Sequence, residues 1–335
     1  MSDERFLVTG ALGCVGAWTV RALVREGTPV IGFDLGTSTR RLDQILEPDE
    51  LERVTLVNGD ITDLGALERV LDEHGITNVI HLAALQIPFC RADPPRGAAV
   101  NVLGTVNVFE AVARRSLTGR PVVYAGSIGM YAPTDVDPAT GRLEETAVPH
   151  PGNHYGVYKL ANEGTARIYW ADSGVASVGL RPMTVYGVGR DQGMTSSPTV
   201  AIAAAVLGRP FEVTFGGATL FQYAEDVAKT LLIASRSDPV GARVFNLGGE
   251  AVAILDWVQA IEAAVPEAAG LLTIAPGELP FPPDIGHESL AALGEVPVTP
   301  YRDGIAASAA TYRRLADEGR LAPTEQGLPA PAPAA

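Results

Sequence analysis

The stretch Phe6-Leu7-Val8-Thr9-Gly10-Ala11-Leu12-Gly13-Cys14-Val15-Gly16 decides the fold of this chain. Its apolar start predicts a buried strand, and the amphipathic segment Trp18–Glu26 that follows predicts a helix. Between the two, Gly10 permits a tight turn, Gly13 lets the backbone approach a phosphate, and Gly16 lets the helix pack closely on the strand. The free N–H groups at the start of such a helix bind the pyrophosphate of a dinucleotide.

An acidic residue follows the next expected strand at the place where a dinucleotide presents its adenosine ribose. The strand Pro29–Phe33 ends in Asp34, 18 residues after Gly16. A carboxylate there accepts hydrogen bonds from the ribose hydroxyls and repels a 2′-phosphate, which favours NAD over NADP. Arg40 and Arg41 keep NADP open, because basic residues nearby can accommodate that phosphate. The alternative for Asp34 is an ordinary turn residue at a strand end.

Strands and helices continue to alternate beyond this point, which predicts an α/β protein with a doubly wound parallel sheet. Ligands of such sheets bind at the carboxyl ends of the strands, so Asp60, Ala83 and Ser127 should line one crevice. The expected strands are Val54–Val57, Val79–Ala84 and Pro121–Ala125, and the expected helices are Leu64–Glu73, Pro94–Arg115 and Tyr155–Ser173.

A tyrosine and a lysine lie one helical turn apart after these strands. The chain has only two lysines among its 25 basic residues, and Lys159 lies four positions after Tyr155, on the same helix face. At ~6 Å and an effective dielectric of ~20, the ammonium attracts a phenolate by ~3 kcal/mol, which would lower the phenol pKa from ~10 to ~8. Tyr155 would then take a proton from an alcohol while Ser127 holds the substrate oxygen. The alternatives are a helix-surface tyrosine and a serine in a turn.

Composition excludes several classes of function. With 335 residues, of which 47% are hydrophobic, the chain can bury a sizeable core. A net charge of −14 argues against binding to nucleic acid or an anionic membrane. Two cysteines cannot form a disulfide framework, the charged start shows no signal peptide, and the longest apolar stretch, Val200–Leu207, is too short to cross a bilayer. The histidines have no ligand spacing, so we expect no metal. The lack of a disulfide framework favours a reducing, cytoplasmic location.

Taken together, these residues resemble the extended short-chain dehydrogenase/reductase superfamily, in particular its NAD-dependent epimerase/dehydratase group. The resemblance covers about residues 5–320. Its motifs are Thr9-Gly10-x-x-Gly13-x-x-Gly16, Asp34, Asp60-Ile61, His81-Leu82-Ala83-Ala84, Asn101, Ser127, Tyr155-x-x-x-Lys159, Leu180-Arg181-Pro182-x-x-Val185-Tyr186-Gly187, Ala224-Glu225-Asp226-Val227-Ala228 and Val244-Phe245-Asn246-Leu247-Gly248-Gly249.

The resemblance implies NAD as the cofactor and assigns residues to it. Asp60 and Ile61 would flank the adenine, Asn101 would support the site from its helix, and Lys159 would also bond the nicotinamide ribose. The expected cofactor contacts are Gly10, Gly13, Cys14, Val15, Gly16, Asp34, Asp60, Ile61, Leu82, Ala83, Ala84, Asn101, Tyr155 and Lys159. The expected substrate contacts are Gln86, Ser127, Ile128 and Arg190. We interpret Cys14 as a packing residue and His81 as a strand-end residue.

The resemblance also divides the chain into two parts. Residues 1–181 would form the dinucleotide-binding domain, and residues 226–250 would return to it with a strand at Ala242–Leu247. Residues 182–225 and 251–321 would form a smaller substrate-binding lobe. Residues 322–335, rich in proline and alanine, would be a disordered tail.

Two departures from the family narrow the reaction. Ile128-Gly129-Met130 follows Ser127 without the acidic pair of sugar-nucleotide dehydratases, so dehydration is not expected. Thr219 stands where related enzymes carry an arginine for a diphosphate, with Arg190 and Arg209 as possible substitutes. The sequence therefore favours an NAD-dependent dehydrogenase of a sugar-like or sugar-acid alcohol without a nucleotide. The alternatives are an NAD-dependent nucleotide-sugar 4-epimerase and an NAD-binding redox sensor.

Related enzymes pair two helices with those of a second copy, so we expect a homodimer. The matching helices, near Pro94–Arg115 and His154–Ser173, are rich in apolar residues. The alternative is that these apolar faces only pack on the sheet.

Overall fold

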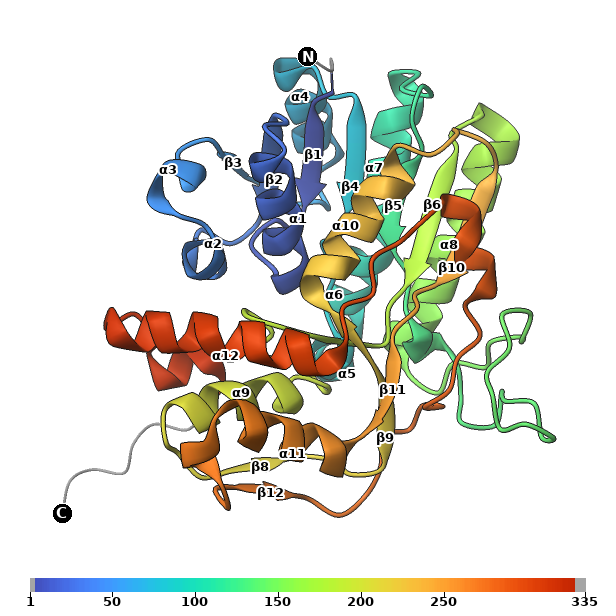
Figure 1. Cartoon of the computed structure of the whole chain (residues 1–335). Coiled ribbons are helices and arrows are strands. Elements are labelled where there is room, and N and C mark those ends of the chain that lie inside the picture. The colour runs from blue at the N-terminus through green and yellow to red at the C-terminus, as the bar shows by residue number, and fades with distance from the viewer. Residues whose placement is uncertain (1–3, 329–335) are drawn as a thin grey trace.

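The centre of the molecule is a seven-stranded parallel sheet. The structure, a computed structural model, describes residues 4–328. Strand order is β10-β6-β5-β4-β1-β2-β3, with every pair parallel, which confirms the predicted doubly wound sheet (Figure 1). The strands are β1 (Phe6–Thr9), β2 (Val30–Asp34), β3 (Thr55–Asn58), β4 (Asn78–His81), β5 (Val122–Ala125), β6 (Ser177–Arg181) and β10 (Ala242–Asn246).

Helices cover both faces of this sheet, because alternate residues of its buried strands point to opposite sides. In β1, Phe6 and Val8 pack into the apolar cluster that contains α1 and α10, whereas Leu7 packs into the cluster of α4, α7 and α8. These helices are α1 (Cys14–Arg25), α10 (Ala224–Ser235), α4 (Leu64–His74), α7 (Gly104–Arg114) and α8 (His154–Ser173). Two short helices, α2 (Arg40–Ile45) and α3 (Pro48–Leu51), follow β2.

The prediction of a single regular helix over Pro94–Arg115 is wrong in one respect. It is interrupted by a π-helical turn at Ala99–Leu103, between α6 (Pro94–Ala98) and α7. The turn contains Asn101, whose side-chain amide bonds both backbone groups of Leu85 after β4. π-Helical turns are rare in proteins, and those that occur are often found at functional sites. A further short helix, α5 (Ile87–Ala92), lies between β4 and α6.

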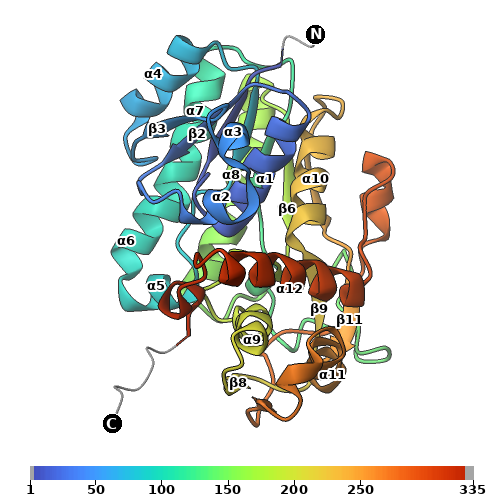
Figure 2. The same ribbon diagram turned by 60° about the vertical axis from the view of Figure 1, so that its left-hand side comes forward.

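A smaller lobe packs below the carboxyl ends of the strands (Figures 1 and 2). It contains a three-stranded sheet and a two-stranded sheet, and its core is aromatic: the fully buried Trp257 stacks on Phe221 at 3.8 Å between ring centroids. Its strands are β7 (Thr184–Tyr186), β9 (Ala218–Tyr223), β11 (Glu250–Ala253), β8 (Phe211–Val213) and β12 (Leu272–Ile274), and its helices are α9 (Ser197–Val206), α11 (Ile254–Ala264) and α12 (Tyr301–Asp317). Short 3₁₀ turns cover Ile128–Met130, Pro266–Ala268 and Glu288–Leu293.

The start of the expected disordered tail is ordered. Residues Pro323–Gln326 form a 3₁₀ turn, and Leu328 is buried against Val200 and Ala204 of α9. Leu328 therefore provides the apolar anchor that the proline-rich composition of the tail does not suggest. The rest of the predicted tail, residues 329–335, lies outside the described residues.

A long connection from the first part of the chain also packs on the lobe. Leu143 bridges to Ile285, and the Arg142 guanidinium pairs with Asp284 and Glu288. The segment around Leu143 was expected in the dinucleotide-binding domain, yet its partners lie in the C-terminal third. Among residues 4–328, no helix is both long and apolar enough to cross a membrane.

Candidate active site

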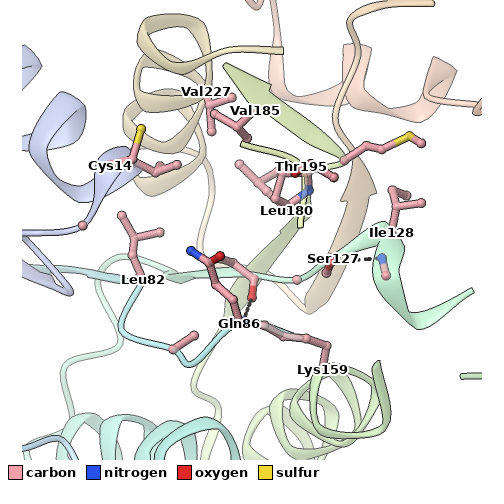
Figure 3. A pocket seen from close by; sticks show the side chains of 18 of the residues that line it. Cys14, Leu82, Gln86, Ser127, Ile128, Lys159, Leu180, Val185, Thr195 and Val227 are labelled. Carbon is pink, nitrogen blue, oxygen red and sulfur yellow. Dashed lines mark hydrogen bonds between the residues drawn. The ribbon is translucent and has the colours of Figure 1, made fainter. Parts of the chain in front are cut away.

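A cavity of about 240 Å³ lies at the carboxyl ends of the central strands (Figure 3). Its lining runs from Gly10 and Gly13 in the glycine turn, past Leu82 after β4, to Ser127 after β5. Arg190 closes it from the side of the smaller lobe. Strand ends that are far apart in the sequence thus meet at one crevice, as a doubly wound sheet requires.

The glycine turn fits the pyrophosphate of a dinucleotide. A Cβ atom on Gly16 would lie 2.0 Å from the Gly10 carbonyl oxygen, and one on Gly10 would lie 2.6 Å from the Ala83 nitrogen. Both glycines are therefore required by close backbone packing. Gly13 precedes α1, and no side chain caps that helix. The first N–H groups of α1 therefore have no side-chain acceptor that would compete with a phosphate.

The Asp34 carboxylate lies beside the glycine turn at the end of β2. Its oxygens accept hydrogen bonds from the backbone N–H groups of Leu12 at 3.0 Å and Gly36 at 2.9 Å. Arg40 and Arg41, which left NADP open in the sequence, are instead paired with Asp191. Each carboxylate oxygen of Asp34 retains further acceptor capacity for a ribose hydroxyl.

The other residues assigned to the cofactor fall into two groups. Cys14, Val15, Leu82 and Ala84 line the cavity. Asp60 and Ala83, which were expected to line the crevice, and Ile61 are not among the residues that line it, and Asn101 is buried beneath the segment after β4. Asn101 therefore holds the Leu85 backbone in place and does not line the cavity. These hydrogen bonds form only when the fold brings Asn101 close to Leu85, which no local sequence pattern indicates.

A buried network holds the end of β4 against β1 and α7. The His81 ring lies between the hydroxyls of Thr9, at 2.7 Å, and Thr105, at 3.0 Å. The Thr105 hydroxyl donates to the Asn101 carbonyl, so it accepts from His81 Nε2–H, and Nδ1 accepts from Thr9. Burial, with a smaller effect of the Lys159 charge, lowers the pKa of His81 to about 3. This neutral, fully engaged ring agrees with the interpretation of His81 as a structural residue.

The structure brings Ser127, Tyr155 and Lys159 together in the cavity. The Ser127 side chain hydrogen-bonds to Tyr155 and also accepts from the Gly129 N–H at 3.0 Å. Lys159 Nζ donates to the Ala125 carbonyl at 2.6 Å and lies 5.5 Å from the centre of the Tyr155 ring. The Asn153 side chain caps α8 and fixes the turn on which Tyr155 lies.

The expected lowering of the Tyr155 pKa by Lys159 is wrong for the protein as described. Burial raises the pKa of Tyr155, and this effect outweighs the hydrogen bond from Ser127 and the positive charge of Arg190, which both lower it. Burial also lowers the pKa of Lys159 to about 8. The cost of burying each charge opposes the attraction between the two groups, and the spacing of the two residues does not reveal that cost.

Arg190 is the substrate-side cation of the cavity. Its Nη2 donates to Thr195 Oγ1 at 3.1 Å, whereas its Nε is buried without a hydrogen-bond partner. Burial lowers the pKa of this guanidinium. Gln86 and Ile128 line the same space. A buried cation with a free N–H is suited to an anionic or strongly polar group of a ligand.

Sequence analysis missed several residues that line this space. Met183 is the second residue after β6, so the strand-end rule could have identified it. Met194 and Thr195 lie on the loop that carries Arg190. Phe281 comes from a proline-rich segment that gave no local signal, because only the packing of the lobe brings it to the cavity.

Thr219, in the position expected for a diphosphate-binding arginine, is fully buried. Its hydroxyl bonds that of Thr184 at 2.8 Å, between the neighbouring strands β9 and β7. Arg209, the other suggested substitute, follows α9 and is not among the residues that line the cavity.

Neither a reactive Cys14 thiol nor a metal site is found among residues 4–328. Burial raises the pKa of Cys14 to about 11, so its thiol stays protonated and packs at the start of α1. Among residues 4–328, no three histidine, cysteine or acidic side chains gather in a way that could hold a metal ion.

The parallel sheet, the glycine turn and the crevice at the strand ends define a Rossmann-type nucleotide-dependent enzyme. More narrowly, the chain belongs to the NAD dependent epimerase/dehydratase family, whose model matches residues 6–248. NAD is thus its cofactor, as predicted.

Relatives of known activity include two kinds of epimerase. The chain is 32% identical to UDP-glucuronate 4-epimerase 2 of Arabidopsis thaliana over 76% of its own length, but the match spans only 63% of that relative. It is 29% identical to the UDP-glucose 4-epimerase of Mycolicibacterium smegmatis, over 92% of this chain and 98% of that one.

Solved structures of the same fold carry the cofactor. The UDP-glucose 4-epimerase of Thermus thermophilus, in complex with NAD, is 25% identical, has a TM-score of 0.77 and matches 92% of this chain and 99% of its own. MoeE5 in complex with UDP-glucuronic acid and NAD is 28% identical with a TM-score of 0.74, and the match covers 93% of this chain and 99% of that one.

Proposed function

We propose that this protein is an NAD-dependent 4-epimerase of a nucleotide sugar, and that the hexose it accepts carries an acidic group such as a uronic acid. The observation that carries the proposal is the cavity itself. Its lining includes the glycine turn, Ser127, Tyr155 and Lys159, and also Arg190, whose buried Nε has no hydrogen-bond partner. This reverses the preference of the sequence analysis, which ranked the epimerase second.

Each polar side chain has one task in the proposed reaction. Tyr155 takes the proton of the C4 hydroxyl, and Ser127, which hydrogen-bonds to Tyr155, holds the substrate oxygen. Lys159 and Arg190 supply positive charge that stabilises the tyrosinate form of Tyr155, which becomes neutral when it takes this proton. NAD held by the glycine turn and Asp34 would supply the hydride acceptor and donor for C4, so that the hydride could return to the opposite face of the sugar. Tyr155 then returns its proton to the oxygen, so the sugar leaves inverted and the enzyme unchanged.

The family relatives support an epimerase over a dehydrogenase. Several related proteins that match this chain at 31 to 34% identity are UDP-glucuronate 4-epimerases. MoeE5 binds UDP-glucuronic acid together with NAD. Arg190 supports an acidic sugar, because a carboxylate can satisfy its free Nε and gain a charge-assisted hydrogen bond.

One observation favours a second candidate, a dehydrogenase of a sugar acid without a nucleotide. Thr219 and Thr184 satisfy each other's hydroxyls and are fully buried, so neither offers a charge to a diphosphate. A diphosphate bound without that arginine loses about 1.5–3 kcal/mol for each missing charged hydrogen bond. In this candidate, NADH leaves and Arg190 binds the carboxylate directly.

Product analysis of the purified protein separates the two candidates. The protein would be incubated with UDP-glucuronate, UDP-glucose and free glucuronate, followed by chromatography of the sugars and detection of NADH. The 4-epimer of UDP-glucuronate without accumulating NADH supports the proposal. NADH formed from free glucuronate supports the dehydrogenase. No conversion of either nucleotide sugar rejects the proposed function.

We also infer that the protein acts as a homodimer through α7, α8 and the π-turn that precedes α7. Phe109 and Val112 are fully buried beneath the sheet, so the apolar content of α7 partly serves the core. Leu103 and Ile168, in contrast, are 47% and 60% exposed. Replacing Ile168 with aspartate should give a monomer in light scattering, and a monomeric unmutated protein would reject the inference.

A further inference from the structure

The loop Gly187–Ser196, here called the bridging loop, connects the glycine turn to the substrate side of the cavity. Its first part is bonded to the nucleotide-binding domain. The Trp18 indole N–H donates to the Val188 carbonyl at 2.9 Å, and Arg41 Nε donates to the Gly189 carbonyl at 3.0 Å. Its second part carries Arg190 and Thr195 into the cavity.

Asp191 fixes this loop through a buried ion cluster. Only 5% of its side chain is exposed, and its carboxylate pairs with Arg41 Nη2 at 2.7 Å and with Arg40. Arg41 also donates a hydrogen bond from Nη1 to the Leu12 carbonyl at 2.9 Å, and Leu12 belongs to the glycine turn. The Arg41 guanidinium therefore connects the glycine turn to Asp191, the residue that follows Arg190.

The backbone of the bridging loop gives it little structure of its own. Gly187, Gly189 and Gly193 all have positive φ, a region that residues with side chains rarely adopt. Gly193 also lies against Gln86, because a Cβ there would be 1.9 Å from Gln86 Oε1. The glycines make the path possible but do not hold it. Two backbone turns, closed by the Arg190 and Ser196 N–H groups, shape parts of the loop, and the ion cluster at Asp191 adds the charged restraint from outside it.

We propose that Asp191 is a positioning residue that closes the bridging loop over the bound cofactor and sets Arg190 against the substrate. Through Arg41 and Leu12 it makes cofactor release and substrate affinity depend on the same contacts. Slow release of NAD is what an enzyme needs if the hydride taken from a sugar must return to that same sugar. The substrate half of this proposal rests on the proposed function, whereas the cofactor half does not.

Cofactor release from Asp191→Asn tests the proposal directly. The protein would be loaded with NADH and mixed with excess NAD, and the loss of NADH fluorescence would give the release rate. Because charged hydrogen bonds are lost, release should become about 10- to 100-fold faster. The matched control is Asp72→Asn, which removes another paired aspartate, bonded to Arg115 on the outer surface. The control should release NADH at the unmutated rate.

Steady-state kinetics separates a positioning role from simple destabilisation. In Asp191→Asn, KM for the sugar should rise at least ~10-fold, with a smaller change in kcat at saturating substrate and NAD. Asp191→Glu should recover part of both effects. If no substrate is turned over, the proposed function fails, but the release measurement still decides the role of Asp191.

Arg41→Lys provides a second variant should Asp191→Asn fold poorly. It keeps the charge but loses the fork that joins Asp191, Gly189 and Leu12, so NADH release should again accelerate. Release rates in Asp191→Asn and Arg41→Lys equal to those of the unmutated protein and Asp72→Asn would overturn the proposal.

Discussion

The glycine turn and the bridging loop both contact the cavity, but their conformations have different origins. The turn is built from neighbours in the sequence, since Gly10 and Gly16 pack against each other within seven residues. The bridging loop is held by Arg40 and Arg41, about 150 residues away from Asp191. The path of the glycine turn is thus specified largely by nearby residues, whereas that of the bridging loop is specified by long-range contacts.

The largest effect should come from removing the proton acceptor, which lines the cavity that both regions contact. Tyr155→Phe should lower turnover at least ~100-fold and leave NAD binding nearly unchanged, because it removes only the proton acceptor. The matched control is Tyr158→Phe, which loses a hydroxyl bonded to the Pro94 carbonyl instead. Steady-state rates and NAD titrations of both variants check this. Near-normal turnover in Tyr155→Phe would remove the tyrosine from the mechanism.

The next largest effect concerns substrate affinity and the role of Arg190. Arg190→Ala should raise KM for an acidic sugar about 10- to 100-fold, since a charged hydrogen bond is lost, and should affect a neutral sugar less. The pKa of Tyr155 should rise further without this charge, so the pH at which activity appears should move upward. Arg190→Lys should retain part of the affinity. Equal losses for acidic and neutral sugars would contradict the role given to Arg190.

The pH dependence of stability tests the hydrogen-bond network of His81 with Thr9 and Thr105. The folded-state pKa of His81 is about 3 and its ordinary value is 6.5, so below pH 6.5 the unfolded chain binds a proton that the folded chain does not. His81 should therefore reduce the free energy of unfolding by up to about 1.4 kcal/mol per pH unit as pH falls below 6.5. Urea unfolding of His81→Gln should show a shallower decline over this range. Equal slopes would mean that His81 titrates in the folded protein.

The smallest expected effect concerns cofactor choice. Asp34→Ala should weaken NAD about 5- to 10-fold and narrow its preference over NADP, because a ribose acceptor and a repulsive charge are both removed. Asp34→Asn is the matched variant that keeps an acceptor oxygen without the charge. Titration of both cofactors into each protein measures the preference. Tighter binding of NADP to the unmutated protein would contradict the role of Asp34.

Much of the nucleotide side could be predicted from the sequence, because its signals are local. The apolar run before Gly10, the glycine spacing and the strand that ends at Asp34 each lie within a few residues of the feature they predict. The parallel sheet followed from the alternation of strands and helices. Ser127 lies in the cavity because it follows β5, and Tyr155 and Lys159, one helical turn apart at the start of α8, join it there.

The remaining features depend on contacts that no local pattern records. The π-turn at Asn101 forms around the distant Leu85 backbone, and Phe281 reaches the cavity only through the packing of the lobe. Leu328 orders the start of a tail whose composition predicts disorder. The raised pKa of Tyr155 results from burial, which a spacing of four residues cannot reveal.

The fate of the hydride at C4 tests the central claim most directly. UDP-glucuronate carrying deuterium at C4 would be converted by the purified protein, and the deuterium content of the sugar product would be measured by mass spectrometry. The proposed epimerase should yield the 4-epimer with its deuterium retained and no accumulation of reduced cofactor. Oxidised sugar together with deuterated NADH in equal amounts, and no epimer, would contradict the account.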